Sequence, residues 1–198
     1  NLIEVYNVGR KKYMKTGKQY KESLRKMKPN IYKFGELIKD VTTHPATKRT
    51  IEGHAQIFDA SLNAEYKNIL TTKSHINGKQ ISRYLSIIKS PEDMIANVRM
   101  KRLMFNLTGT CTGGRCAGFN ALNSMWATTF DIDNDLETDY HKRIKKWLEY
   151  AQNSDITLAG ALTDPKGDRS KAPSDQKDPD LSLHFIERND DGIVVRGA

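Results

Sequence analysis

Apolar side chains recur every three or four positions along much of the chain, and this spacing predicts amphipathic helices. One helix should begin after Thr16, at the start of a capping box, and end before Pro29. The same spacing predicts helices over residues 50–63 and 140–151. The first three quarters of the sequence are therefore expected to be mainly helical.

A further helix is predicted after Ser90, where a serine cap, a proline and two carboxylates favour a helix start. We expect it to run to about Leu107, with Arg102 on its buried side. An arginine so placed usually pairs with a carboxylate or a phosphate. The apolar residues expected on the same face are Ile95, Val98 and Phe105.

The remaining segments of this region are predicted as one core helix, one loop and one turn. Residues 117–128 are apolar on nearly all sides, which is typical of a central core helix. Residues 131–135 form an acidic loop that lacks the glycine and the downstream glutamate of a calcium loop. His44 precedes a proline, so a turn is expected there.

Beyond residue 151 the pattern changes from helical to extended. Residues 156–162 and 181–187 are predicted strands, and the turn at residues 189–192 predicts a hairpin with residues 193–195. Three strands rarely form a core alone. We therefore expect an α+β organisation whose β-domain is completed by chain outside this sequence. The predicted parts are a basic arm (1–15), a helical domain (16–153) and the beginning of a β-domain (154–198).

The net charge of +8 is concentrated at one end of the chain. Residues 1–33 contain ten Lys and Arg against two Glu, whereas the other 165 residues balance 22 basic against 22 acidic side chains. A basic face for nucleic acid is therefore not demanded by composition. The basic arm is predicted to be solvated, although it could attract a phosphorylated ligand.

The sequence carries neither an apolar run long enough to cross a bilayer nor an export signal, so we expect a cytoplasmic protein without membrane contact. Its two cysteines, Cys111 and Cys116, are too few for a disulfide framework. They are expected to be buried, redox-active or metal-bound thiols.

Both cysteines lie in residues 108–123, a stretch whose four glycines should prevent it from propagating a helix. Such a loop is expected to grip a ligand. Four residues separate the two thiols, whereas zinc and thioredoxin-type pairs usually have two. On spacing alone, structural thiols are favoured over a metal or a cluster.

A second polar loop covers residues 162–174 and continues to Asp180. Long loops without their own secondary structure are usually functional or disordered, and the prolines here argue against disorder. Lys166, Arg169 and Lys171 offer cationic donors, and Gly167 would let the backbone approach a pyrophosphate. A solvated charged turn is an equally good interpretation of the residues alone.

Several motifs resemble the family of flavin-dependent 4-hydroxyphenylacetate 3-hydroxylases, and within it the 4-hydroxybutyryl-CoA dehydratase branch. The resemblance runs from about Gln19 to Ala198. It is most specific in Thr-Asp-Pro-Lys-Gly-Asp-Arg (163–169), Gln-Lys-Asp-Pro-Asp-Leu (176–181) and Asp-Gly-Ile-Val-Val-Arg-Gly-Ala (191–198).

The resemblance implies two cofactors and residues that hold them. Cys111 and Cys116 match the first two ligands of a [4Fe–4S] cluster, although the family pattern has three intervening residues and this sequence has four. Arg102 and Arg115 could neutralise anionic groups nearby. A histidine and a third cysteine that ligate the cluster, and the catalytic base, are expected beyond Ala198. The residues expected to contact FAD are Leu162, Thr163, Asp164, Pro165, Lys166, Gly167, Asp168, Arg169 and Ser174.

The same resemblance implies an acyl-CoA dehydrogenase-like fold whose C-terminal helical bundle is absent from this chain, assembled as a homotetramer with the remaining C-terminal part of the enzyme. The implied reaction is the dehydration of the acyl-CoA substrate 4-hydroxybutyryl-CoA to crotonyl-CoA, with vinylacetyl-CoA isomerase activity. In this radical mechanism the α-proton leaves first, FAD takes one electron, and the cluster acts as a Lewis acid on the hydroxyl.

Two other functions stay open. One is an FADH2-dependent aromatic 3-monooxygenase of the 4-hydroxyphenylacetate type, which needs no iron. The other is a non-enzymatic module that binds polyanions through its basic arm, in a salt-dependent manner.

Overall fold

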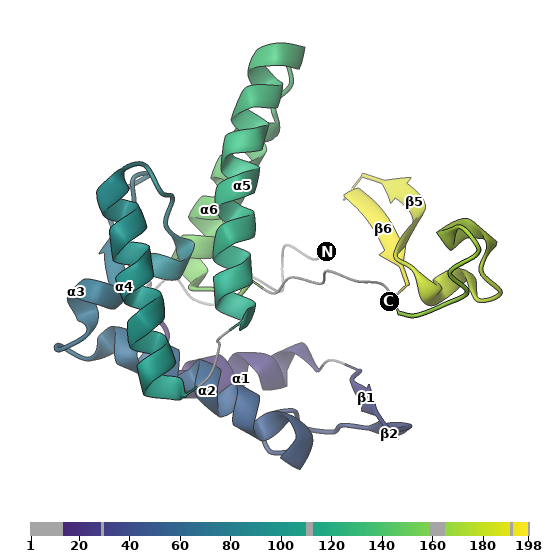
Figure 1. Cartoon of the computed structure of the whole chain (residues 1–198), viewed down its shortest axis with the longest axis horizontal. Helices are drawn as coiled ribbons and strands as arrows, with labels where there is room; N and C mark the ends of the chain where they lie inside the picture. Colours follow the sequence, from purple (N-terminus) through teal and green to yellow (C-terminus); the bar gives the residue numbers. More distant parts are fainter. Residues whose placement is uncertain (1–13, 29, 110–112, 159–164, 191, 198) are drawn as a thin grey trace. The chain divides into compact units, whose positions relative to one another are not determined.

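A computed structural model describes residues 14–28, 30–109, 113–158, 165–190 and 192–197 (Figure 1). The chain divides into two compact units, one within Lys11–Ala159 and the other within Gly160–Ala198. The two are described separately below. The domain limits expected from the sequence stay a prediction. None of the described helices is long and apolar enough to cross a membrane.

Helices build the larger unit, together with two short antiparallel hairpins in which β1 pairs with β2 and β3 pairs with β4. The helix expected after Thr16 is confirmed. The elements of this unit are α1 (Gly17–Met27), β1 (Tyr32–Lys33), β2 (Glu36–Leu37), α2 (Pro45–Leu62), α3 (Lys67–Leu70), β3 (Thr71–Lys73), β4 (Gln80–Ser82), the 3-10 turn η2 (Arg83–Leu85), α4 (Pro91–Thr108), α5 (Gly113–Leu136) and α6 (Tyr140–Ser154).

Local capping fixes where α1 and α2 begin. The Thr16 hydroxyl accepts from the Gln19 N–H at 3.1 Å, and the Gln19 side chain accepts from the Thr16 N–H at 2.9 Å, which completes the predicted capping box. The turn expected at His44 is confirmed, since residues 41–44 form a turn and bend before α2. His44 has an extended backbone and is the N-cap of α2, where its Nδ1 accepts from the Ala46 N–H at 3.1 Å. Pro45 fits the first helical turn, where its missing N–H would have had no intrahelical partner.

Helix α4 begins as predicted, but it buries a different face. The Ser90 hydroxyl accepts from the Asp93 N–H at 3.2 Å. The buried side chains are Asn97, Met100 and Met104, whereas Arg102 is exposed. Apolar residues surround much of this helix, so their spacing could not identify the face that meets the core. The predicted companions of Arg102 are about half exposed: Ile95 53%, Val98 50% and Phe105 46%.

Ser90→Ala should lower the free energy of unfolding by about 1 kcal/mol, because an N-cap hydroxyl then no longer satisfies an orphan helix N–H. Urea denaturation of the purified protein measures this loss. Ser124→Ala is the matched control, since Ser124 is an exposed residue in the interior of α5, where alanine is the better helix former. Equal losses in the two variants would contradict the capping role of Ser90.

Helix α5 extends beyond both predicted ends. It begins at Gly113, inside the glycine-rich stretch that was expected to be a loop, and it includes residues 131–135, which were also expected to be a loop. Asp133 then caps α6, accepting from the N–H groups of Tyr140 and His141 at 2.8 Å each. The expectation of burial on nearly all sides is wrong, because Met125 is 51% exposed.

Three clusters of buried side chains form the core of the larger unit. The first joins α2, α3, η2, α4 and α5, the second lies between α1 and α2, and the third lies beneath α5 and α6, which pack together in Figure 1. Their main members are Ile57, Leu70, Tyr84, Met100, Met104 and Phe119 in the first, Tyr20, Ile51, Ala55 and Phe58 in the second, and Ile87, Leu122 and Leu148 in the third.

The smaller unit consists of a long loop followed by an antiparallel hairpin. The predicted hairpin is confirmed, with Phe185 opposite Val195, although its first strand begins later than the expected residue 181. A strand was expected over residues 156–162. Residues 156–158 have no regular structure, and residues 159–162 lie outside the described residues. The elements are η3 (Pro173–Asp175), η4 (Pro179–Leu181), β5 (His184–Asn189) and β6 (Gly192–Arg196).

Candidate functional site

Arg115, expected to neutralise an anionic group, is buried in the first turn of α5. Its side chain is 1% exposed, and its Nη2 lies 2.8 Å from Oδ1 of Asp155, whose side chain is 4% exposed. The same Nη2 donates to the Ile156 carbonyl at 3.4 Å. Asp155 also accepts from the Lys15 N–H at 3.0 Å through Oδ2. This ion pair therefore joins three segments that are distant in the sequence.

Aromatic rings surround the Arg115 guanidinium. Its Cζ lies 4.3 Å from the centre of the Phe58 ring and 5.2 Å from that of Tyr84, distances at which a cation is attracted to a ring face. Burial, followed by the charge of Arg115, lowers the pKa of His54. Nη1 of Arg115 is buried without a hydrogen-bond partner. Most of this guanidinium is thus committed to the core, and its contact with a cofactor stays a prediction.

Cys116 follows directly on Arg115. Its side chain is half-buried and packs against the first core cluster, near the start of α5. Its role as a metal ligand stays a prediction. Cys111 lies outside the described residues. In the described part of the chain, no three His, Cys, Asp or Glu side chains gather as a metal site would require.

The polar loop of the smaller unit contains the other predicted site residues. Leu162, Thr163 and Asp164 lie outside the described residues, whereas Lys166, Arg169 and Ser174 are exposed on the loop surface, as are Pro165, Gly167 and Asp168.

Hydrogen bonds within this loop hold Asp168. Its Oδ1 accepts from the Ser170 hydroxyl at 2.6 Å and from the Ser170 N–H at 3.0 Å, and these bonds lower the pKa of the Asp168 carboxyl. The Lys171 ammonium lies 3.7 Å from Oδ2. Asp168 is therefore an anion that shapes the turn, and Lys166 and Arg169 on either side of it are the groups able to meet a phosphate.

Side chains of the same loop segment occupy the space beside Gly167. A Cβ there would lie 2.5 Å from Oε1 of Gln176 and would also meet the Leu181 side chain. The sequence predicted instead that this glycine would let the backbone approach a ligand. The adjacent hollow measures about 160 Å³, well below the roughly 300–1,000 Å³ of typical ligand pockets. By itself it has room for a phosphate-sized group, so a whole flavin would need further chain.

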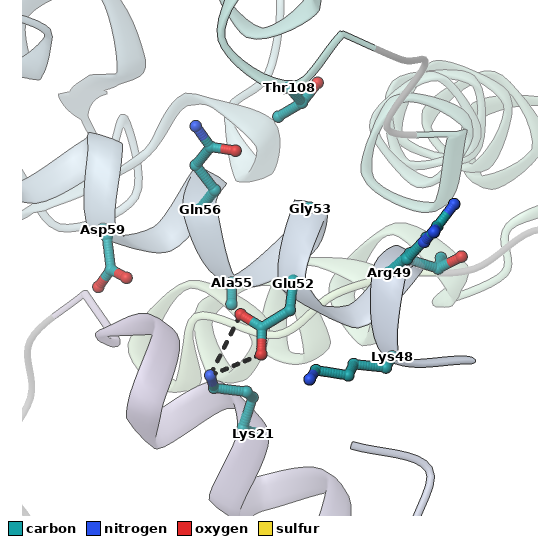
Figure 2. Close-up of a pocket in the computed structure, with 10 residues that line it drawn as sticks. Lys21, Lys48, Arg49, Glu52, Gly53, Ala55, Gln56, Asp59 and Thr108 are labelled. Atoms are coloured by element: carbon teal, nitrogen blue, oxygen red, sulfur yellow. Dashed lines mark hydrogen bonds and ion pairs between the residues drawn. The ribbon is translucent and has the colours of Figure 1, made fainter. Parts of the chain in front are cut away.

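A larger groove lies between α1 and α2, next to the end of α4, and the sequence reasoning did not identify it (Figure 2). Its volume is about 850 Å³. Lys21 forms an ion pair with Glu52 at 3.0 Å, and Lys48 and Arg49 project from the beginning of α2. The adjacent Lys48 and Arg49 were the available signal in the sequence. Its described lining combines the cations Lys21, Lys48 and Arg49 with the carboxylates Glu52 and Asp59, so the groove offers a binding surface of mixed charge.

Comparison with known proteins identifies relatives over nearly the whole chain. The family described as 4-hydroxyphenylacetate 3-hydroxylase N terminal matches residues 16–198. The 4-hydroxybutyryl-CoA dehydratase/vinylacetyl-CoA-Delta-isomerase of Clostridium aminobutyricum is 43% identical over 183 residues, covering 92% of this chain and 37% of the relative. The 4-hydroxyphenylacetate 3-monooxygenase oxygenase component of Geobacillus sp. (strain PA-9) is 28% identical over 183 residues, with the same coverage.

Solved structures agree with these relatives. An oxygen-tolerant archaeal 4-hydroxybutyryl-CoA dehydratase from N. maritimus matches with a TM-score of 0.82 and 38% identity, over 93% of this chain and 36% of that one. The oxygenase component HpaB complexed with FAD and 4-hydroxyphenylacetate matches with a TM-score of 0.71 and 24% identity, over 92% and 37%, which shows a common fold. The chain spans little more than a third of these relatives. The family resemblance predicted from the motifs is confirmed. The chain shares the fold of the matching parts of these structures and is mostly helical with small sheets, while the expected acyl-CoA dehydrogenase-like architecture of the complete enzyme stays a prediction.

Proposed function

Because the chain belongs to the 4-hydroxyphenylacetate 3-hydroxylase N-terminal family, we propose that it forms the N-terminal part of a 4-hydroxybutyryl-CoA dehydratase. The proposed reaction removes water from 4-hydroxybutyryl-CoA to give crotonyl-CoA, with vinylacetyl-CoA isomerisation as a second activity. One observation carries this choice: over spans of 183 residues the chain is 43% identical to a dehydratase and 28% identical to a monooxygenase. We further propose that the complete enzyme is a homotetramer.

The cysteine pair supports the dehydratase branch of the proposal. Cys116 lies near the start of α5 and is half-buried, and cysteine thiolates are the usual ligands of iron–sulfur clusters. Cys111 and Cys116 would supply two ligands of a [4Fe–4S] cluster, and the remaining ligands would come from outside this chain. When bound, the cluster would provide a Lewis acid for the hydroxyl that leaves. Arg115 would act by fixing the first turn of α5 and hence the position of Cys116.

The loop in the smaller unit supports a flavin. Lys166 and Arg169 are exposed cations on a turn shaped by Asp168, and they would bind the pyrophosphate of FAD. FAD would supply one-electron chemistry. A second candidate function, an FADH2-dependent aromatic monooxygenase without iron, is favoured by the likeness to HpaB structures that contain FAD.

Iron, acid-labile sulfide and flavin should be measured on the full-length protein purified without oxygen, together with its dehydratase activity. We expect about four irons and one FAD per protomer, as one [4Fe–4S] cluster requires. Flavin without iron would favour the monooxygenase and leave both cysteines as structural thiols.

Cys111→Ala combined with Cys116→Ala should remove the iron and the dehydratase activity, because both proposed thiolate ligands of this chain are lost. The matched control is Ser124→Ala, which changes one exposed side chain elsewhere on α5. Circular dichroism would verify that both proteins are folded. Iron and activity that survive in the double variant would refute the assignment of these cysteines.

A further inference from the structure

A single carboxamide closes the loop of the smaller unit. Oε1 of Gln176 accepts from the Asp168 N–H at 3.0 Å, while Nε2 donates to the Asp168 carbonyl at 2.8 Å and to the Lys171 carbonyl at 3.3 Å. The side chain therefore satisfies both backbone groups of Asp168, as a neighbouring β-strand would. Within residues 165–179, all of which the structure describes, only Gln176 is half-buried, and the others are exposed.

Gly167 and Gln176 fit each other. The Oε1 atom of Gln176 occupies the position that a side chain at residue 167 would need, since a Cβ there would lie 2.5 Å away. Only a residue without a side chain lets the amide reach the backbone of the next residue. Gly167 and Gln176 therefore act together, although Gln176 lies eight positions after the Asp168 that it binds.

We propose that Gln176 is a positioning residue that holds the backbone of Asp168, and thereby Lys166 and Arg169, in the arrangement that receives the pyrophosphate of the flavin. The inference rests on the proposed function, in which this loop binds FAD. Gln176 itself has no assigned contact with the cofactor.

The other bonds of Asp168 are local, since they join it to Ser170 and Lys171, whereas Gln176 ties this turn to the segment that follows η3. Exposed Lys and Arg side chains are flexible, and ordering them together with their backbone opposes binding. A loop closed before the ligand arrives avoids the backbone part of that cost. Without the Gln176 amide, the Asp168 N–H would turn to water and the segment carrying both cations would become mobile.

Two variants of the full-length protein separate positioning from folding. Gln176→Met keeps a similar length but removes every hydrogen bond of the amide, and it should raise the dissociation constant for FAD by about tenfold to hundredfold. Gln176→Glu retains an acceptor but loses the donor while ionised. A protonated glutamic acid can again donate, so the FAD affinity of this variant should recover as the pH falls below about 4.3, the usual pKa of glutamic acid.

Gln80→Glu is the matched control. It carries the same charge change, and Gln80 also donates through Nε2, in this case to the Thr71 hydroxyl at 2.7 Å. Its FAD affinity should follow the pH dependence of the wild type. Melting curves of the flavin-free proteins would show whether each variant is folded.

Hydrogen exchange of the Asp168 amide in flavin-free protein tests the hydrogen bond between Gln176 and Asp168 independently of the cofactor. We expect faster exchange in Gln176→Met than in the wild type. If this amide exchanges equally fast in both, or if folded Gln176→Met binds FAD as tightly as the wild type, the inference is overturned. A wild-type protein that binds no FAD instead overturns the proposed function. The hydrogen exchange of the Asp168 amide would still decide whether Gln176 holds this backbone.

Discussion

Arg115→Ala is expected to lower the free energy of unfolding by about 3–5 kcal/mol, the loss typical of removing one partner from a buried ion pair. The substitution would leave the Asp155 carboxylate buried, with a side chain only 4% exposed, and without its cationic partner. It would also remove the guanidinium that lies against the rings of Phe58 and Tyr84. Urea denaturation followed by circular dichroism would measure the change.

The control for this result is another arginine–aspartate pair at the same distance. Arg143 and Asp139 also approach to 2.8 Å, but their side chains are 69% and 57% exposed. Arg143→Ala should therefore cost at most about 1 kcal/mol. If the two alanine variants lose the same stability, burial is not what gives the Arg115 pair its importance.

Arg115→Ala could fail to fold, so a double variant keeps the argument testable. Combining Arg115→Met with Asp155→Asn removes both charges, and asparagine tolerates the left-handed backbone of residue 155, where φ is 40°. The double variant should be more stable than Arg115→Ala, because no unpaired charge remains buried. A double variant that is equally unstable would assign the loss to packing alone.

Gly118→Ala is expected to destabilise the protein by about 1–3 kcal/mol, although alanine is intrinsically the better helix former. A Cβ at this position in α5 would lie 2.6 Å from the carbonyl oxygen of Leu158 and would overlap the Leu158 side chain. Because the oxygen belongs to the backbone, relieving the overlap requires the chain after α6 to move. Thermal denaturation would show a lower midpoint.

The matched comparison is Gly53→Ala in α2. A Cβ at Gly53 would meet no atom within 4 Å, so only helix propensity acts there. This substitution should stabilise the protein by about 0.5–1 kcal/mol. The two glycine variants are thus expected to change the midpoint in opposite directions, and a rise in both would mean that α5 can move away from Leu158 at little cost.

The sequence predicted correctly those features that are encoded locally. The starts of α1 and α4 depend on Thr16 and Ser90, whose hydroxyl groups bind N–H groups three residues away. The hairpin likewise depends on a turn and on two neighbouring strands. Such signals are contained in a few adjacent residues, and no other part of the fold needs to be known to interpret them.

Predictions from the sequence were wrong where contacts between distant residues determine the structure. Glycine content predicted a loop before α5, yet the helix begins at Gly113, and Arg115 in its first turn binds a carboxylate forty residues away. The face of α4 was wrong because its core partners come from other helices. At the candidate site, the motifs predict a role for Lys166 and Arg169 that stays a prediction, whereas the bonds of Gln176 could not be inferred without the folded loop.

The contact between Lys15 and Asp155 has a consequence for folding during synthesis. These residues are 140 positions apart, and the Lys15 N–H lies directly before the cap of α1. The ribosome must therefore release nearly the whole larger unit before this hydrogen bond can form. Helices α1 and α2 can pair earlier, but the segment that leads into α1 must wait for the end of α6 to emerge. Lys15 is synthesised 140 positions before its partner Asp155, so it must wait for this contact far longer than α1 waits for α2.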